Sequence, residues 1–226
     1  MVGPVELELL ASGRDADVYV LDDDRVLRRY RRGGDVTAEV RFMRHVRAHD
    51  FPAPVVFRAD GPDLELSRLS GPTLLEALLS NELDAREAAE LLADLHWRLH
   101  AVPALTTPDP AVRVLHLDLH PDNVILTPDG PVVIDWRNAT EGSPALDLAM
   151  TALILAQASL SGDPITAESA AEGMYAFRER VGRQLLAGLP EAVARRSNDP
   201  ALTANEVRLL SRAACLVSSP RRPGSH

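Results

Sequence analysis

Two acidic side chains and one amide stand close together in the middle of the chain. Asp118 and Asn123 belong to the segment 116–123 (HLDLHPDN), and Asp135 follows in 134–136 (IDW). Phosphoryl transfer needs a base or orienting group for the acceptor hydroxyl, and metal-borne charge that neutralises the phosphates. Oxygen ligands suit magnesium, which shares its shell with phosphate. These residue types therefore have the chemistry of a phosphoryl-transfer site.

Each of these residues also has a purely structural interpretation. Asp118 can be a turn residue, Asn123 a strand cap and Asp135 a solvated strand end. Short apolar strands are predicted at 112–115, before the loop, and at 124–126 and 132–134, around the turn 127–130 (TPDG). This arrangement places Asp118 and Asn123 on one tight loop and Asp135 at the end of a hairpin. The joint spacing favours the functional interpretation.

The motif resembles a known family. The segment 116–123 resembles the H-x-D-x-H-x-x-N loop of aminoglycoside phosphotransferases, choline kinases and their relatives, and 134–136 is similar to their metal-binding Asp motif. Residues 95–102 (LHWRLHAV) and 142–149 (GSPALDLA) look like the family's flanking helices. By this resemblance Asp118 is the catalytic base or orienting residue, Asn123 and Asp135 bind Mg²⁺, and the cofactor is ATP.

The resemblance implies an α+β fold of the protein-kinase-like type with two lobes. We expect a small antiparallel-sheet N-lobe with one helix in residues 1–69, a mainly helical C-lobe in 70–217, and a disordered tail in 218–226. The strand and helix patterns agree with this division. The N-lobe strands are predicted at Val5–Leu10, Asp17–Leu21, Arg25–Tyr30, Val55–Arg58 and Leu64–Leu69, with a helix that begins at Asp35 or Thr37 and runs to about His49.

A charged pair is predicted in the N-lobe. Glu39 falls within the apolar arc of the predicted helix, where a charge is costly unless it is paired. Strand alternation places Val26, Arg28 and Tyr30 on one face, so Arg28 is the natural partner of Glu39, with Val26 above the adenine. The alternative is that Glu39 reaches solvent. In that case Arg28 would join a solvated basic edge, which is the interpretation we favour for Arg29, Arg31 and Arg32.

Most kinases carry Lys at the position of Arg28. All 24 basic residues of this chain are Arg, and choline-kinase-like relatives carry Arg in a similar setting. Arg keeps the charge and can grip phosphate oxygens. The turn 12–17 (SGRDAD), with Gly13, resembles the short phosphate turn of the aminoglycoside-kinase group. Adenine is expected to bond to the backbone near Ser67 and Leu69.

Several other polar residues need an interpretation. Zinc binding by His116 and His120, with His96 and His100 upstream, is disfavoured because no Cys lies near. His116 is expected to bond to the loop backbone, and His100 to pack behind it. Asp147 is expected to cap its helix or to brace the loop.

The composition excludes several classes of protein. The 226 residues have a net charge of −9, which disfavours nucleic-acid binding. The single cysteine fits a reducing compartment. The first residues lack a basic signal region, and the most apolar stretch, 145–160, is too short to span a membrane. We therefore expect a cytoplasmic protein without a membrane partner; its oligomeric state is not indicated.

These observations predict an ATP- and Mg²⁺-dependent phosphotransferase that acts on a hydroxyl of a small molecule. A protein kinase is disfavoured because 120–121 (HP) replaces the usual loop lysine and little chain separates Asp135 from Asp147. The alternative is a nucleotide-binding pseudokinase or interaction module. It is favoured by Arg28 in place of the usual Lys and by a phosphate turn with a single glycine. The acceptor is not indicated. The helical residues Glu168, Glu172 and Glu179 could line a cationic pocket or form a solvated face.

Overall fold

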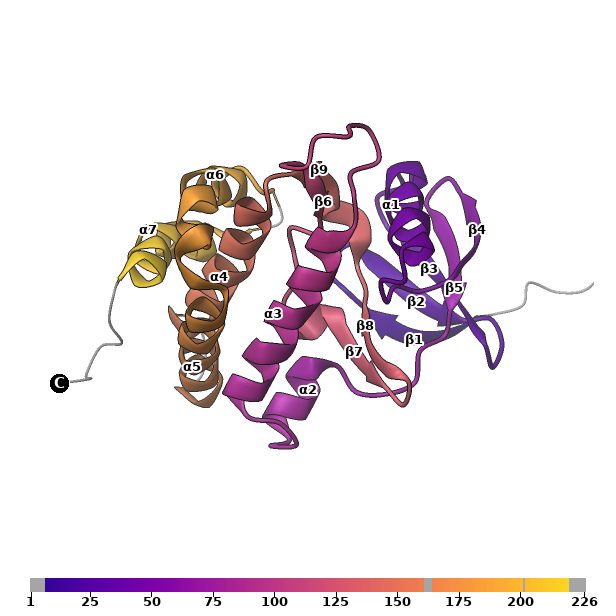
Figure 1. Ribbon diagram of the computed structural model, residues 1–226. Coiled ribbons are helices and arrows are strands. Elements are labelled where there is room, and N and C mark those ends of the chain that lie inside the picture. The colour runs from indigo at the N-terminus through magenta and orange to yellow at the C-terminus, as the bar shows by residue number, and fades with distance from the viewer. Residues whose placement is uncertain (1–6, 161–163, 201, 220–226) are drawn as a thin grey trace, which may run out of the picture.

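The computed structural model describes residues 7–160, 164–200 and 202–219 and has a sheet-rich part followed by a helical part (Figure 1). The first part is a five-stranded antiparallel sheet in the order β1-β2-β3-β5-β4. Its strands are β1 (Glu8–Ser12), β2 (Ala16–Val20), β3 (Arg25–Tyr30), β4 (Val56–Asp60) and β5 (Asp63–Ser67). The strand predicted at 25–30 is confirmed. The first predicted strand is shifted, because β1 continues to Ser12; Val5 and Glu6 lie outside the described residues.

One helix, α1 (Thr37–Ala48), accompanies the sheet. Val36 is the N-cap residue and its side chain makes no capping hydrogen bond. Asp35, one residue earlier, contacts the start of the helix, since its Oδ1 accepts the backbone N–H of Thr37 at 2.8 Å. The residues Glu39, Val40, Met43 and Val46 are buried and share the face predicted from their spacing. The helix thus places one acidic side chain within an otherwise apolar contact with the sheet.

The chain passes between the two parts through a close backbone approach at Gly71. Its φ of +141° is rarely adopted by residues with a side chain, and a Cβ there would lie 2.0 Å from the carbonyl oxygen of Leu126. The next residue, Pro72, accepts a hydrogen bond from the Leu126 N–H at 2.9 Å. Only glycine fits where the connecting segment lies against the hairpin that carries the candidate site.

The helical part contains most of the core. Its helices are α2 (Leu74–Leu79), α3 (Ala85–Ala101), α4 (Pro144–Leu160), α5 (Pro164–Val181), α6 (Leu185–Ser197) and α7 (Ala204–Ser218). The middle of α4 is buried on most sides and packs against α5, α6 and α7 (Figure 1). The predicted disordered tail is wrong at its start, because Ser218 is the last residue of α7; residues 220–226 lie outside the described part. No described helix is long and apolar enough to cross a membrane.

Two small ribbons hold the loop between α3 and α4. The predicted hairpin is confirmed as β7 (Val124–Thr127) with β8 (Gly130–Val133). The predicted strand before the loop is β6 (Arg113–Leu115), and it pairs with β9 (Thr140–Gly142), which was not predicted. A three-residue strand with the sequence TEG has no apolar alternation that could indicate it. These ribbons fix both ends of the segment from His116 to Asp135.

Candidate active site

The predicted ion pair of Arg28 and Glu39 is present, and Asp135 joins it to form a triad. Nη1 of Arg28 lies 2.9 Å from Oε1 of Glu39, and Nη2 lies 2.6 Å from Oδ1 of Asp135. Arg28 comes from β3, Glu39 from α1 and Asp135 from the end of the β7–β8 hairpin. One guanidinium therefore joins the sheet-rich part to the candidate metal ligand.

The surroundings of this triad explain its electrostatics. Burial lowers the pKa of Arg28, but Asp135 and Glu39 outweigh burial and leave that pKa raised. Burial raises the pKa of Asp135, but Arg28 outweighs it and leaves that pKa lowered. Burial raises the pKa of Glu39 in spite of Arg28. The hydroxyl of Tyr30 donates to Oε2 of Glu39 at 2.6 Å. Sequence reasoning placed Tyr30 on the face of Arg28 but assigned it no role.

The loop at Asp118 is held by backbone contacts. Nε2 of His116 donates to the carbonyl oxygen of Ile134 at 3.0 Å, and its Nδ1 accepts the N–H of Asp118 at 3.3 Å, which confirms the expected bonding to loop backbone. Leu117 adopts the left-handed conformation, with φ +64°. This conformation is costly for a branched residue and needs support from its surroundings. The carboxylate of Asp118 is 27% exposed and accepts no hydrogen bond from the described residues; Nε2 of His120 lies 3.8 Å from its Oδ1.

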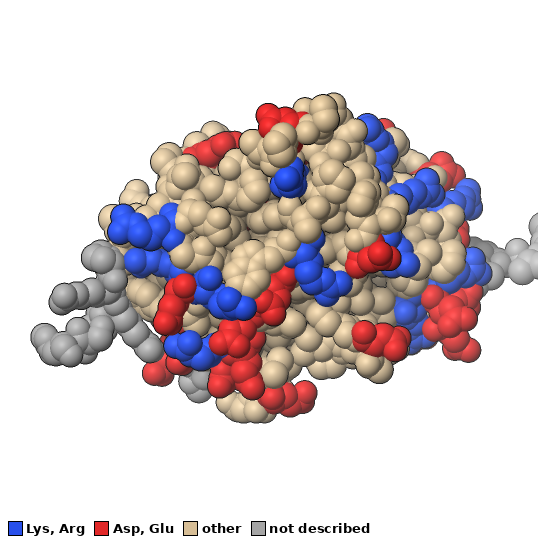
Figure 2. All heavy atoms as spheres, viewed as in Figure 1, with Lys and Arg blue, Asp and Glu red and all other residues tan. Residues whose placement is uncertain are grey.

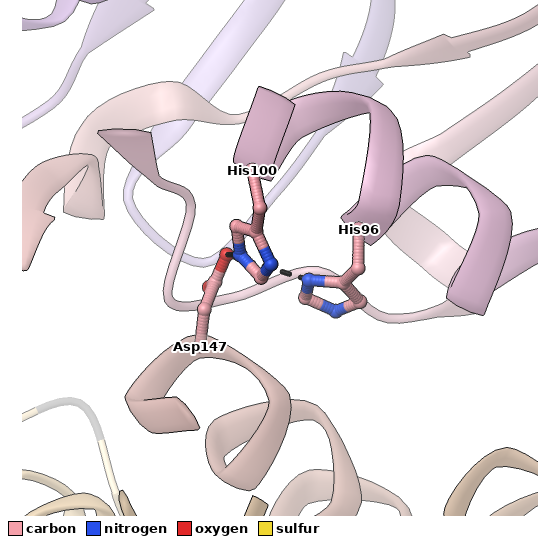
Figure 3. Close-up of side chains that lie close together, drawn as sticks. All are labelled: His96, His100 and Asp147. Carbon is pink, nitrogen blue, oxygen red and sulfur yellow. Dashed lines mark hydrogen bonds and ion pairs between the residues drawn. The ribbon is translucent and has the colours of Figure 1, made fainter. Parts of the chain in front are cut away.

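Asp147 holds this loop from the first turn of α4. Of the two roles predicted for it, a helix cap or a loop brace, the structure shows the brace. Its Oδ1 accepts the N–H of Leu117 at 2.7 Å, and its Oδ2 accepts the N–H of His116 at 3.2 Å. Behind it, Nε2 of His100 lies 2.9 Å and Nδ1 of His96 lies 3.4 Å from Oδ2 (Figure 3). The side chain is fully buried, and the two histidines outweigh burial to lower the pKa of Asp147 well below its usual value.

The hydrogen bonds of Thr151 show which ring nitrogen of His96 carries a proton. Thr151 donates its hydroxyl proton to the carbonyl oxygen of Leu119 at 2.7 Å, so Nε2 of His96 is the donor in its 2.8 Å contact with Thr151. Nδ1 of His96 then faces Asp147 without a hydrogen-bond partner among the described residues. Burial lowers the pKa of His96. The ligand atoms of His96, His100 and Asp147 lie within 4.8 Å of one another, but Asp147 already serves the loop backbone.

Asn123 and Asp135 offer oxygen atoms that suit a magnesium ion. Nδ2 of Asn123 donates to the carbonyl oxygen of Asp118 at 2.9 Å, which leaves Oδ1 without a hydrogen-bond partner among the described residues. The same holds for Oδ2 of Asp135, whose other oxygen meets Arg28. Nδ2 of Asn123 also lies 3.2 Å from Nε2 of His120, which must accept. Burial lowers the pKa of His120, in keeping with a neutral ring. An amide and a carboxylate oxygen are ligands that Mg²⁺ accepts.

The turn with Gly13 is held by contacts with the side chain of Arg31, which directly follows β3. Arg31 is exposed, as expected, but it also lies 2.6 Å from Oδ1 of Asp17 and donates to the carbonyl oxygens of Gly13 at 2.8 Å and Arg14 at 3.2 Å. The Gly13 N–H donates to the carbonyl oxygen of Ala16 at 2.9 Å. The side chain of Arg31 therefore braces the turn in one shape.

The same turn is tied to the segment after the hairpin. Nη1 of Arg137 lies 2.9 Å from Oδ2 of Asp15, and the Arg137 guanidinium covers the ring of Tyr30 at 4.8 Å. The turn is thereby joined to the residues that follow Asp135. Sequence reasoning gave no signal for this contact, because it depends on how the two parts pack.

The backbone N–H groups near Ser67 and Leu69, where adenine is expected to bond, differ in their hydrogen bonding. The N–H of Ser67 donates to the carbonyl oxygen of Val55 at 2.9 Å, and that of Arg68 donates to Asp24 at 2.7 Å. The N–H of Leu69 makes no hydrogen bond to the described residues. Val26 is 7% exposed and lies on the sheet face of Arg28. Of the backbone N–H groups of residues 67–69, that of Leu69 is the one without a hydrogen bond to the described part of the chain.

Two of the three helical glutamates lie in a hollow apart from the site residues. Glu172 and Glu179 line a surface hollow of about 490 Å³ between α3 and α5, together with Arg86 and Arg178. Figure 2 shows acidic and basic side chains mixed on this face of the molecule. The hollow contains none of the predicted site residues, and Glu179 pairs with Arg86 at 3.3 Å. This is a solvated charged face.

The sequence matches the family model described as "Phosphotransferase enzyme family", in two overlapping matches over residues 6–113 and 58–189. Thiamine kinase of Salmonella heidelberg (strain SL476) is 33% identical over 146 residues, which cover 48% of this chain and 51% of that protein. The chain spans about half the length of the curated relatives it matches.

Solved structures share the fold. A choline/ethanolamine kinase family protein from Mesorhizobium loti aligns with a TM-score of 0.55 and 14% identity, covering 96% of this chain and 90% of that one. A thermostable mutant of aminoglycoside phosphotransferase APH(4)-Ia, in ternary complex with AMP-PNP and hygromycin B, aligns with a TM-score of 0.63 and 15% identity, covering 94% and 93%. The predicted α+β, two-lobed protein-kinase-like fold is confirmed.

Proposed function

This chain belongs to the phosphotransferase enzyme family, and we propose that it transfers the γ-phosphate of ATP, with Mg²⁺, to a hydroxyl group of a small molecule. The observation that carries the proposal is the bridge of Arg28 between Glu39 and Asp135. It joins the part that would bind nucleotide to the loop that carries Asp118. The proposed division of the chain into a nucleotide lobe, 1–69, and a catalytic lobe, 70–217, follows from the same arrangement.

Each residue of the site has a proposed role. Asp118 receives the proton of the acceptor hydroxyl, since its carboxylate has no hydrogen-bond donor among the described residues and is partly exposed. Asn123 and Asp135 hold magnesium through Oδ1 and Oδ2. Magnesium bound there supplies positive charge to the phosphate oxygens. Arg28 keeps Asp135 ionised and in place.

The nucleotide would lie along the sheet. The Leu69 N–H, which has no hydrogen-bond partner among the described residues, would bond adenine, and Ser67 and Val26 would border the ring. The turn at Gly13, held by Arg31, would approach the phosphates. AMP-PNP in the complex of the APH(4)-Ia mutant supports a nucleotide in this fold.

A binding module without turnover is the second candidate, because Arg28 stands where most kinases have Lys. Arg28 nonetheless makes both contacts, and Asp118, Asn123 and Asp135 are all present. A protein kinase is disfavoured by the short stretch after Asp135, which β9 ties to β6.

The deciding experiment is ATP consumption with a panel of acceptors that includes thiamine, choline, aminoglycosides and alcohols that carry a carboxylate or a phosphate. We expect Mg²⁺-dependent turnover with at least one acceptor, and a fall of about 10²- to 10⁴-fold in Asp118→Asn. The control is Asp122→Asn, an exposed carboxylate on the same loop, which should keep its activity. A wild type that binds ATP and never turns it over would favour the binding module.

A further inference from the structure

Arg196, a basic residue of the helical part, has no part in the function proposed above. Arg196 lies in the last turn of α6, and its Nε donates to Oε1 of Gln157 at 2.6 Å. Nε2 of Gln157 in turn donates to the carbonyl oxygen of Glu206 at 3.0 Å. Gln157 is only 5% exposed. Arg196 is therefore held by α4 and α7 in a fixed orientation.

The other two guanidinium nitrogens of Arg196 are unused. Neither Nη1 nor Nη2 makes a hydrogen bond or ion pair with the described residues, although the side chain is partly buried. Burial lowers the pKa of Arg196, and the first of the acidic groups that oppose this is Asp118, followed by Asp199 and Glu206. A partly buried cation with free donors is costly for the folded protein and offers a binding site for an anion.

The position of Arg196 relative to Asp118 follows from α4. Thr151 of this helix holds the loop through the carbonyl oxygen of Leu119, at 2.7 Å. Gln157 lies six residues further on, which is about 9 Å along the helix axis. The loop and Arg196 are thus attached to one buried helix, at points about 9 Å apart along its axis. A small organic molecule can span a distance of that order.

The contacts of Arg196 lie on helices of the helical part and not on the five-stranded sheet. In Figure 1 the helices α4, α6 and α7 gather at the end of the molecule opposite the five-stranded sheet that carries Arg28. The Gly13 turn reaches this side through Arg14, whose Nη2 lies 3.7 Å from Oε1 of Glu206. Arg196 therefore stands where the acceptor, not the adenosine, would lie.

We infer that Arg196 binds an acidic group, a carboxylate or a phosphate, on the acceptor alcohol whose hydroxyl reaches Asp118. This inference rests on the proposed function and names the class of its substrate. A guanidinium presents paired N–H donors that match two oxygens of such a group. Cationic alcohols would meet a like charge at this position, so the site discriminates against them.

The test compares small alcohols that differ in the charge and chemistry of one end group. Glycerol, glycerate and glycerol 3-phosphate form one series, in which a neutral end group is replaced by a carboxylate or a phosphate. Binding to the full chain is measured by calorimetry in wild type, Arg196→Gln and the control Arg195→Gln. Arg195 is the neighbouring residue, and it pairs with Glu191 on the exposed side of α6.

We expect wild type and Arg195→Gln to bind at least one acidic member more tightly than glycerol. Arg196→Gln should lose about 10- to 100-fold of that affinity, as expected for hydrogen bonds to a charged group. If wild type binds no acidic member better than glycerol, or if Arg196→Gln binds it equally well, the inference is wrong. Binding is read without turnover, so an absence of ATP consumption would overturn only the proposed function.

A kinetic measurement distinguishes contact of Arg196 with the acceptor from contact with the transferred phosphoryl group. If Arg196 instead contacted the transferred phosphoryl group, Arg196→Gln would slow ATP hydrolysis without acceptor as much as it slows transfer, and the inference would be overturned. We expect hydrolysis without acceptor and the KM for ATP to stay unchanged, while the KM for an acidic acceptor rises.

Discussion

Nη2 of Arg28 lies 2.6 Å from Oδ1 of Asp135, although 107 positions of sequence separate the two residues. The same guanidinium meets Glu39 on α1 at 2.9 Å. One cation therefore sits between two carboxylates, one from each part of the molecule. Its charge holds the candidate metal ligand ionised, and its two arms set the distance between the sheet and the hairpin.

Replacing Arg28 tests this bridge. Arg28→Met leaves two partly buried carboxylates without a cation, so we expect a loss of about 3 kcal/mol in the free energy of unfolding. Arg28→Lys keeps the charge but lacks the two guanidinium N–H arms that reach both carboxylates. We expect it to lose less free energy of unfolding than Arg28→Met. Denaturant unfolding measures both. Arg29→Met, which breaks an exposed pair with Asp63, is the control and should cost about 0–1 kcal/mol. Equal losses in Arg28→Met and Arg29→Met would contradict the bridge.

The brace at Asp147 can be removed without changing the size of the side chain. Asp147→Asn exchanges one acceptor oxygen for an N–H donor, which would face a backbone N–H of the loop or a histidine. We expect a loss of about 2–3 kcal/mol in unfolding free energy and a fall in kcat of at least about tenfold, because Leu117 loses support for its left-handed backbone. The control is Asp94→Asn on the exposed face of α3. Full activity in Asp147→Asn would show that the loop holds itself.

The pH dependence of stability should depend on His96. Its folded-state pKa is lowered from 6.5 by burial, so the unfolded chain binds more protons below that value. Stability is then present above pH 6.5 and is lost as the pH falls toward the folded-state pKa, with a slope of up to about 1.4 kcal/mol per pH unit. Unfolding measured at pH 7, 6 and 5 should show a shallower decline in His96→Gln than in wild type. The same decline in both proteins would exclude His96 as its source; His49→Gln, at an exposed position, is the matched control.

The close approach at Gly71 gives a prediction about packing. Gly71→Ala would place a Cβ 2.0 Å from the Leu126 carbonyl oxygen, so the connecting segment or the hairpin must move. Gly33 also has a positive φ, +67°, but open space around it, so Gly33→Ala isolates the backbone cost of about 1–2 kcal/mol. We expect Gly71→Ala to lose clearly more than Gly33→Ala in thermal unfolding. A smaller loss would mean that the segment adapts at little cost.

The sequence predicted contacts and turns correctly where they follow from periodicity or from a short motif. Helical spacing put Glu39 on an apolar face and strand alternation put Arg28 opposite it, and the pair exists. The hairpin was predicted because TPDG is a turn signal between apolar runs. Both inferences use interactions between residues that are near in sequence or belong to one repeated pattern. The roles of Asp118, Asn123, Asp135, Gly13, Ser67 and Leu69 remain predictions that the experiments above address.

Other relationships have no local signal. The chain by itself determined the family, the order of the elements and the residue types of the site, because short-range spacing and turn chemistry encode these. Only the tertiary structure decided that Arg28 also meets Asp135, that Arg31 braces the Gly13 turn, and that Gln157 of α4 holds Arg196. Each of these depends on how separate helices and strands pack, and the energy of that packing is spread over many apolar contacts that no single motif records.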